Sequence, residues 1–423
     1  MSSSSASGSQ DTPDIVVIGG GIVGISCALF LQRDGRRVTV IDPAEPGSRD
    51  QTSFGNAGSI SSSSVLPTAM PGIYKKLPGM LMDPTGPLAI QWRYLPRLTP
   101  FLLSFLRYSS RANAENSGRA IASVINRVAA AYQILLDETG TRDLVVRNGA
   151  LKVFKTDESF ATSSFERQLL EQNDCRFDVL NEDELRQLEP SLQPIFKHAI
   201  FMPDSQTAVN PGAMVRRFAE HFVAKGGKIV RAEARDVRFV DGVPRTVVTT
   251  AGEFDAETIV LAAGAWSRDM ARKLGASVLL EAERGYHIML PKPPVMPKRF
   301  ITFADRKFAT LPHEDGLRVT TGVEYAKVDA PPDYRRIRGM LPFAKESFRD
   351  LDTTEQSIWL GRRPTLPNSV PVIGRSPRHN NVLLAFGHSH LGLTMGPATG
   401  QIIADLAAGR DPGLDLTPYR ADR

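Results

Sequence analysis

The sequence predicts an α/β fold with a Rossmann-like domain, discontinuous along the chain, and a second domain built on an antiparallel β-sheet. Three observations carry this prediction. An apolar strand leads into a glycine-rich turn near the N-terminus, short β-rich runs separated by turns recur between residues 228 and 386, and an apolar helix follows them. The 423 residues, 42% hydrophobic and 23% charged, have a globular composition and suffice for one to three domains.

The first chemical motif is the turn at residues 19–24, which reads GGGIVG and has the spacing GxGxxG. Here Gly19 allows a tight turn, Gly21 lets the backbone approach a pyrophosphate, and Gly24 lets helix and strand pack closely. The helix that follows offers free N–H groups and a partial positive charge to phosphates. The next strand ends at Asp42, whose carboxylate can accept hydrogen bonds from a ribose. This combination predicts a bound dinucleotide, although the motif alone does not distinguish FAD from NAD.

The other elements follow from apolar periodicity and from the position of glycine and proline. We expect strands at 14–18, 37–41, 149–154, 228–232, 258–263, 285–290, 317–323 and 382–386, helices at 25–34, 121–138, 213–225 and about 395–406, and hairpin turns at 241–242 and 251–252. No second GxGxxG occurs. Because enzymes that reduce a flavin with NAD(P)H commonly carry a second fingerprint, a flavin in this chain would be reduced by the substrate itself.

Charge and cysteine content narrow the class of partner. The net charge is +5, without a run of five Lys or Arg residues, so we expect no nucleic-acid surface. The two cysteines, Cys27 and Cys175, are too few for a disulfide framework or a zinc site. The pair His388 and His390 has HxH spacing, but no third ligand cluster accompanies it, so we expect no metal.

The N-terminal residues 1–12 resemble neither a signal peptide nor an anchor, and we expect a disordered tail. Residues 77–106 come nearest to an apolar run long enough to span a membrane, but Asp83, Arg93 and Arg97 interrupt it, so we expect no membrane span. This region predicts either a helical pair facing the core or a surface that rests on a membrane. We therefore expect a cytoplasmic protein, free or peripheral to the inner membrane.

Four further motifs follow the glycine turn, in this order: Thr52–Ile60, Ala262–Trp266, Gly361–Pro364 and Gly387–Thr394. Together they resemble the FAD-dependent D-amino-acid dehydrogenase and glycine oxidase (DAO) family, over nearly the whole chain after residue 13. Within it, SFGNAG at 53–58, ERGYH at 283–287 and FGHSHLG at 386–392 resemble the bacterial branch that includes glyphosate oxidoreductase. Related branches oxidise D-amino acids, glycine, sarcosine or D-hydroxyproline.

The resemblance implies FAD as the cofactor. The residues it implies for FAD contact are Gly19, Gly21, Ile22, Val23, Gly24 and Asp42 in the first motif, Ser53, Asn56, Ala57 and Gly58 in the loop after it, Val237, Ala263 and Gly264 in the middle of the chain, and Gly387, His388, Leu391, Gly392, Leu393 and Thr394 near its end. The helix that begins after these last residues would stabilise negative charge on the reduced flavin. Family members usually have a small residue at position 390, where this chain has His390.

The same resemblance implies the catalytic residues. By the family pattern Arg363 faces the flavin and takes the substrate carboxylate bidentately, whereas strand alternation turns Arg362 to the opposite face. Related enzymes have a substrate-contacting tyrosine near Tyr286, so Tyr286 and His287 are candidates, although either could pack in the sheet. We expect His388 to shape and polarise the flavin pocket rather than to act as a general base. If Arg363 is not the anchor, Arg284 is the next choice.

The implied function is oxidation of a D-amino acid, or a related amino or imino acid, to an imine that water hydrolyses to the 2-oxo acid. Hydride would pass from Cα to flavin N5, and the electrons then to a quinone, an electron-transfer protein or O2. The alternatives are an N-substituted glycine such as glyphosate or sarcosine, D-hydroxyproline, and, from other classes, an NAD-dependent dehydrogenase or a non-catalytic flavin carrier. We expect residues 13–64, 200–275 and 356–423 to form the FAD-binding domain and residues 65–199 and 276–355 the substrate domain.

Overall fold

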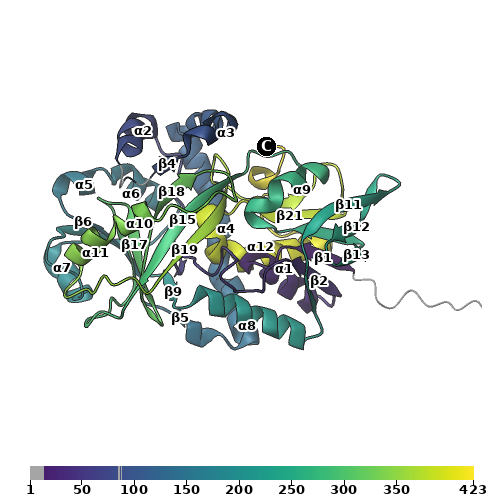
Figure 1. Cartoon of the computed structure of the whole chain (residues 1–423), viewed down its shortest axis with the longest axis horizontal. Helices are drawn as coiled ribbons and strands as arrows, with labels where there is room; N and C mark the ends of the chain where they lie inside the picture. Colours follow the sequence, from purple (N-terminus) through teal and green to yellow (C-terminus); the bar gives the residue numbers. More distant parts are fainter. Residues whose placement is uncertain (1–13, 84–85, 87) are drawn as a thin grey trace, which may run out of the picture.

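The computed structural model describes residues 14–83, 86 and 88–423, so the predicted tail at 1–12 lies outside the described residues. Two large sheets dominate the fold, one toward each end of the molecule (Figure 1). A six-stranded sheet carries the glycine-rich turn, and a nine-stranded sheet faces it. The chain passes between the two sheets several times, so each is assembled from segments far apart in the sequence.

The six-stranded sheet has the order β10-β2-β1-β14-β21-β20. Its strands are β1 (Ile15–Ile18), β2 (Val38–Asp42), β10 (Lys228–Arg231), β14 (Thr258–Leu261), β20 (Val372–Arg375) and β21 (Val382–Phe386). All neighbours are parallel except β20 and β21. Apart from the half-buried Thr258 at the start of β14, the strands at its centre are apolar and buried, as is typical of parallel sheets covered on both faces.

Helices cover one face of this sheet, and a small antiparallel sheet with a further helix covers the other. The covering elements are α1 (Ile22–Arg33), α4 (Arg111–Thr139), α8 (Pro211–Ala224) and α12 (Gly392–Ala407) on the first face, and β11 (Ala234–Val240), β12 (Val243–Thr249), β13 (Gly252–Asp255) and α9 (Ser267–Lys273) on the second. Helix α1 begins at Ile22, directly after Gly21 and earlier than expected from periodicity. Its first amides therefore point out of the glycine turn.

The nine-stranded sheet has the order β19-β15-β18-β17-β16-β6-β8-β7, with β4 beside β18. Its strands are β4 (Leu88–Ile90), β6 (Ala150–Phe154), β7 (Asp178–Leu180), β8 (His198–Met202), β15 (Glu281–Leu290), β16 (Phe300–Phe303), β17 (Phe308–His313), β18 (Gly316–Tyr325) and β19 (Ser357–Thr365). Most pairings are antiparallel, but β6–β16 and β4–β18 are parallel. By its hydrogen bonds β19 belongs to this sheet, although it falls in the range 356–423 expected for the FAD-binding domain.

The remaining elements lie outside the two large sheets and the layers that cover the first of them. They are β3 (Ser59–Ile60), β5 (Val145–Val146) and β9 (Gln206–Ala208), which form a three-stranded sheet, the helices α2 (Ile73–Met82), α3 (Leu95–Tyr108), α5 (Asp157–Ala161), α6 (Ser164–Gln172), α7 (Glu182–Leu188), α10 (Arg335–Arg338) and α11 (Leu341–Ser347), and single 3₁₀ turns at Trp92–Tyr94, Arg142–Leu144, Gly264–Trp266, Ser389–Leu391 and Thr417–Tyr419.

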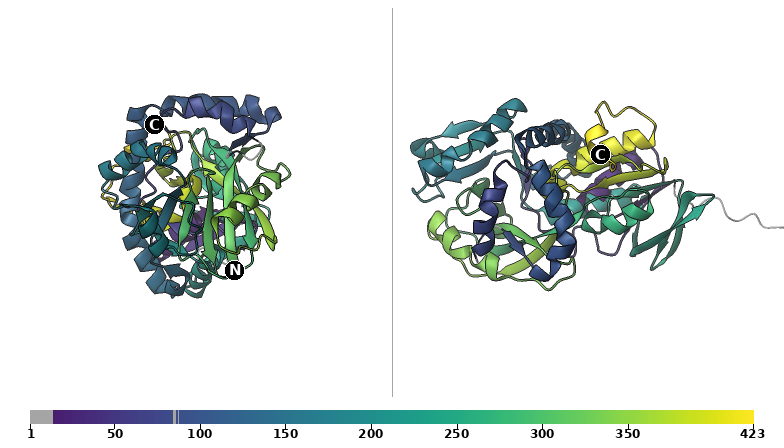
Figure 2. Two further views of the ribbon diagram at one scale, coloured as in Figure 1. Left: turned by 90° about the vertical axis from the view of Figure 1, so that its left-hand side faces the viewer. Right: turned by 90° about the horizontal axis from the view of Figure 1, so that it is seen from above.

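The apolar region at 77–106 folds as two helices, α2 and α3, which lie together at the top of the molecule in Figures 1 and 2 (left). Their inner faces pack on β4 and β18 through Leu98, Phe101 and Tyr325. Apolar side chains of this region stay exposed, among them Trp92 in the 3₁₀ turn before α3 (70%) and Leu103 on α3 (64%). Within the described part of the chain, no helix is both long enough and apolar enough to cross a membrane.

Candidate active site

A cavity of about 830 Å³ lies between the two large sheets. It is bounded by the carboxyl ends of β1, β2, β14 and β21 and, on the other side, by β15, β18 and β19. Ligands of open α/β sheets bind outside the carboxyl ends of the strands, and this volume falls within the range of ligand-binding cavities. The cavity is therefore the candidate active site.

The glycine turn forms the edge of the cavity under the first sheet. A Cβ on Gly24 would lie 1.9 Å from the Gly19 carbonyl oxygen, and Gly19 itself has φ +109°, so these two glycines hold helix α1 against the sheet. The surroundings of Gly21 are different. A Cβ there would meet only Ser53 Oγ, at 3.3 Å, and otherwise point into the cavity. The turn thus leaves a space that a side chain would fill, which is the shape needed for a pyrophosphate against the N-terminus of α1.

The other groups at this end fit the ribose and phosphates of a dinucleotide. The carboxylate of Asp42 accepts hydrogen bonds from the amides of Gly20 (2.6 Å) and Ala44 (2.7 Å), which fix its orientation. Each oxygen still has a lone pair for a ribose hydroxyl. Burial raises the pKa of Asp42. The hydroxyl of Ser53 accepts from the amide of Ile22 at 3.0 Å and so joins the 53–58 loop to the helix terminus.

The 53–58 loop is held in place by side chains of the opposite sheet. From β18, Arg318 donates from Nη1 to the carbonyl oxygens of Phe54 (3.3 Å) and Asn56 (2.7 Å). From β15, His287 lies 3.2 Å from the carbonyl of Gly55, through Nδ1. Both side chains are buried, and burial lowers the pKa of Arg318 to about 9 and that of His287 well below its usual range. The neutral imidazole of His287 therefore donates its Nδ1 proton to the carbonyl oxygen of Gly55. His287 is not among the residues that line the cavity.

The segment before α12 closes the cavity near the C-terminus. The buried ring of His388 contacts Thr399 Oγ1 through Nε2 at 2.9 Å, and burial lowers its pKa to about 3, so it is neutral at physiological pH. His390 borders the cavity and is exposed there, and desolvation by the surrounding protein atoms lowers its pKa. Among the described residues, no group of three or more His, Cys, Asp or Glu side chains is placed to hold a metal ion. This segment presents the N-terminus of α12 to the cavity.

The opposite wall carries the predicted carboxylate anchor, Arg363 on β19, which is 23% exposed at the cavity. Its Nη1 is 2.9 Å from Oε1 of Glu283 on β15 and also donates to the carbonyl of Gly322 at 3.2 Å. The guanidinium lies against Gly285, where a Cβ would be 2.4 Å from Nη2. Among the described residues no acceptor is bonded to Nη2 or Nε of Arg363, so these donors are available to a ligand.

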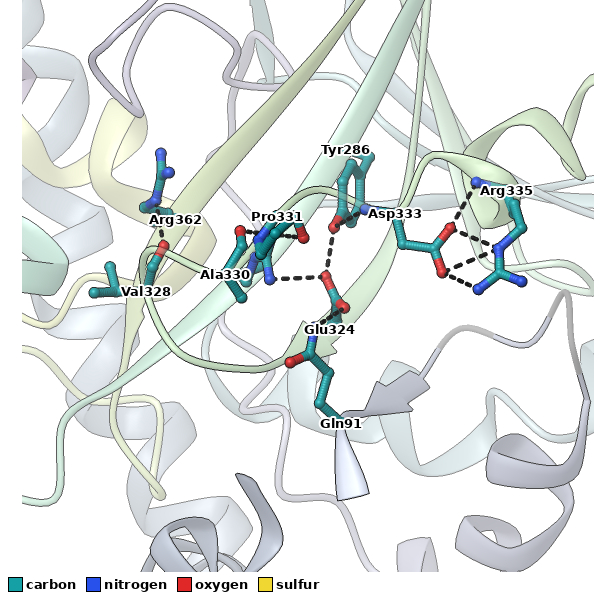
Figure 3. A network of polar contacts seen from close by, with 10 residues as sticks. Gln91, Tyr286, Glu324, Val328, Ala330, Pro331, Asp333, Arg335 and Arg362 are labelled. Atoms are coloured by element: carbon teal, nitrogen blue, oxygen red, sulfur yellow. Dashed lines mark hydrogen bonds and ion pairs between the residues drawn. The ribbon is translucent and has the colours of Figure 1, made fainter. Parts of the chain in front are cut away.

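Figure 3 shows that Tyr286 belongs to a different polar network. Its hydroxyl donates to Glu324 and accepts from the amide of Asp333 at 3.2 Å. On the same face of β15, the wholly buried Arg284 donates from Nη2 to the carbonyls of Ala330 and Pro331, at 2.8 and 3.0 Å. Alternation along the strand turns both side chains away from Glu283 and Gly285. Tyr286 borders the cavity and also belongs to the core of the second sheet, whereas Arg284 is not in the cavity wall.

The structure brings most of the predicted residues to one cavity. Those in its wall are Gly19, Gly21, Ile22, Val23, Asp42, Ser53, Asn56, Ala57, Ala263, Gly264, Tyr286, Arg363, His388, Leu391, Gly392, Leu393 and Thr394. The others, Gly24, Gly58, Val237, His287 and Gly387, lie behind the wall. On β11 the cavity is bordered by Ala234 and its neighbours rather than by Val237, which is packed in the core.

Two buried charges at the site were not found from the sequence. Arg318 sits in a β-rich run that no motif marks, and Glu283 was noted only as the first residue of the ERGYH segment, with no role assigned to it. A charged residue in an otherwise apolar strand is a signal that it needs a partner across the sheet. The sequence alone does not name that partner, which here depends on the strand order β19-β15-β18.

Comparison with known proteins agrees with this geometry. The profile of a family described as FAD dependent oxidoreductase (DAO) matches residues 14–406. The chain is 36% identical to a D-amino-acid oxidase of Bradyrhizobium diazoefficiens, over 97% of this chain and 98% of that protein. It is 30% identical to a D-amino acid dehydrogenase of Helicobacter pylori, over 93% and 94%. A crystal structure of glycine oxidase from Geobacillus kaustophilus superposes with a TM-score of 0.75 at 21% identity, over 97% and 99% of the two chains.

Proposed function

Because this chain belongs to the DAO family of FAD-dependent oxidoreductases, we propose that it oxidises the amino group of a D-amino acid to the imine, which water hydrolyses to the 2-oxo acid. The observation that carries this proposal is Arg363, whose free Nη2 and Nε donors border the cavity between the cofactor side and the second sheet. A planar guanidinium matches an α-carboxylate by two parallel hydrogen bonds. The names of two relatives that align over nearly their full length point to the same substrate class.

In this proposal FAD lies along the cavity with its adenosine end at Asp42 and Ala234 and its pyrophosphate at Gly21 and Ser53. The segment before α12 would then meet the flavin ring, where the partial positive charge of a helix N-terminus favours negative charge. When bound, FAD supplies the acceptor for the two electrons that leave the substrate as hydride.

The residues of the chain bind and orient the substrate. With the carboxylate on Arg363, proximity and a fixed direction for the Cα–H bond provide most of the rate enhancement. The amine must react in its neutral form, because hydride leaves Cα only when nitrogen has a free lone pair. No base is needed from His388, whose Nε2 is already 2.9 Å from Thr399 Oγ1 and whose low pKa removes its charge.

An N-substituted glycine remains a second candidate substrate. It shares the α-carboxylate that Arg363 would bind and differs in carrying its substituent on nitrogen.

We test the two candidates together by mixing the purified holoenzyme, without oxygen, with D-amino acids, L-amino acids, glycine, sarcosine and glyphosate, and recording the flavin absorbance. We expect bleaching by D-amino acids and none by their L-enantiomers. Bleaching confined to N-substituted glycines would replace the D-amino-acid proposal, and bleaching by none of the panel would end both. Reoxidation by O2 or by a quinone then identifies the electron acceptor.

We further propose that α2 and α3 rest on an anionic membrane surface. The exposed apolar side chains of this region are Met82 (83%) at the end of α2, Trp92 (70%) in the 3₁₀ turn before α3 and Leu103 (64%) on α3. Arg93 and Arg97 lie close to Trp92 in the sequence. Residues 73–108 contain five Lys or Arg and a single acid, Asp83. Apolar side chains flanked by cations are the pattern of a helix lying in a lipid interface.

Sedimentation with vesicles tests this surface. The enzyme should sediment with vesicles of phosphatidylcholine and phosphatidylglycerol, much less with phosphatidylcholine alone, and less as salt is added. Replacing Trp92 and Leu103 together by Ser should lower the bound fraction about fivefold or more. Val179→Ser, which removes an exposed apolar side chain elsewhere, is the matched control. Equal sedimentation of all three proteins would contradict the proposal.

A further inference from the structure

The carboxylate beside the anchor has no role in the reaction described above. Glu283 is buried, and both of its oxygens are engaged inside the protein. Its Oε1 accepts from Arg363 Nη1 at 2.9 Å, and its Oε2 accepts from Thr365 Oγ1 at 3.1 Å. The register places Glu283 directly opposite Arg363 in the β15–β19 pair, so the strands themselves keep the ion pair together.

This pair occupies one nitrogen of the Arg363 guanidinium and, among the described residues, leaves its other donors free. Its Nη1 is committed to protein acceptors, Glu283 and the carbonyl of Gly322. The absence of a side chain at Gly285 lets the plane of the guanidinium lie against β15. A carboxylate that enters the cavity is therefore left with the edge formed by Nη2 and Nε, and hence with one orientation.

We propose that Glu283 is the positioning residue of the substrate anchor: it fixes which edge of Arg363 receives the carboxylate, and it makes the site favour one carboxylate over two. This inference rests on the proposed function. The charge argument follows from the same contacts, because the Arg363–Glu283 pair has no net charge. In a ligand with two carboxylates, Arg363 would bind the first. The negative charge of the second would then lie near Glu283 and be repelled by it, because the pair contains no second cation.

The buried pair also affects its neighbour. His390 lies close enough for both charges to act on its pKa, Glu283 raising it and Arg363 lowering it, within a larger decrease due to desolvation. The net effect lowers the pKa of His390 from its ordinary value. The other guanidinium in the cavity wall is that of Arg362, whose Nε donates to the carbonyl of Val328 at 2.8 Å, outside the Arg363–Glu283 pair.

Two substitutions separate the two parts of the proposal. In Glu283→Gln the amide oxygen can still accept from Arg363, so geometry is kept and only the charge is removed. In Glu283→Ala the contact itself is lost. Glu281→Gln is the matched control, because Glu281 lies on the same face of β15, is equally buried, and pairs with Arg268 (2.7 Å) and Tyr94 (2.6 Å) outside the cavity wall.

The measurements use holoenzyme with bound FAD. The change in flavin absorbance gives the dissociation constants of propionate and succinate, which have no amine to oxidise. Anaerobic stopped flow with the best amine of the panel gives the limiting rate of flavin reduction. Glu283→Gln should raise the affinity for succinate relative to propionate about tenfold, with the rate within about threefold of the parent. Glu283→Ala should lower the rate about tenfold or more while propionate binds at least as tightly. Glu281→Gln should leave both quantities within about twofold.

The proposal is overturned if Glu283→Gln leaves the succinate-to-propionate ratio unchanged, or if a FAD-loaded Glu283→Ala reduces its flavin at the parent's rate. Should Glu283→Ala fail to retain FAD, the Gln variant decides alone. If the proposed function is wrong, no amine of the panel bleaches the flavin of the parent enzyme. That outcome is distinct from both results that would overturn the role of Glu283.

Discussion

Gly21→Val is expected to abolish FAD binding while leaving the fold intact. In the structure a Cβ at Gly21 meets only the Ser53 hydroxyl, at 3.3 Å, and any larger side chain extends into the cavity at the N-terminus of α1. The added atoms would occupy the space of the pyrophosphate without disturbing the packing of the protein. The purified variant should be colourless, with circular dichroism like that of the parent and no flavin released on heating.

The neighbouring glycine gives the contrast that makes this result specific. In Gly24→Val the Cβ would sit 1.9 Å from the Gly19 carbonyl oxygen, so this variant should lose the fold and not only the cofactor. If a folded Gly21→Val protein retains one FAD per chain, the glycine turn is not the cofactor site.

Arg363→Lys should lower kcat/KM for the best amine about 10²-fold or more, which corresponds to about 3 kcal/mol. A lysine can keep a single contact with Glu283, but it presents a point charge and lacks the second, planar edge that is left free in Arg363. The carboxylate would be held less precisely, and Cα would lose its fixed direction. Steady-state kinetics on protein with confirmed FAD content measures the effect.

The pH dependence provides a control on the same variant. Because only the neutral amine reacts and amino acids are mostly protonated near neutral pH, kcat/KM should rise with pH through the ionisation of the amine, for parent and variant alike. Arginine keeps its charge over this range. If Arg363→Lys works within about twofold of the parent, the carboxylate is bound elsewhere. Arg284 can no longer take that role, since it is wholly buried on the opposite face of β15, which leaves Arg362 in the cavity wall.

Local signals and the family resemblance predicted residues at the glycine turn, at Asp42 and before α12, and the structure places most of them in the wall of one cavity. The glycines of the first turn, Asp42 and the residues before α12 are each fixed by a strand end or a helix start, and such positions are visible in a single stretch of sequence. The fold class follows from the same signals together with the resemblance, and the family profile confirms it.

The contacts of the opposite wall were harder to predict because they depend on pairing between distant strands. Whether Tyr286 faces the cavity or the core is decided by the phase of β15, and the sequence offers no end or turn that fixes this phase at Tyr286. The partners of Arg363 and Arg318 come from other strands and from the 53–58 loop. Contacts of this kind are set by register, which becomes known only when the whole sheet is assembled.

The order of strands in the first sheet also has a consequence for synthesis of the chain. Strands β1 and β2 leave the ribosome first, but their sheet is completed by β14 and β21, which follow hundreds of residues later. Helix α1 must likewise wait for α12, where Gly400 packs against Ser26. Such long-range pairing makes folding slow and leaves apolar surface exposed meanwhile. The N-terminal third of a nascent chain therefore has no finished core of its own, and a chaperone that shields it until the last helix emerges would raise the yield of active protein.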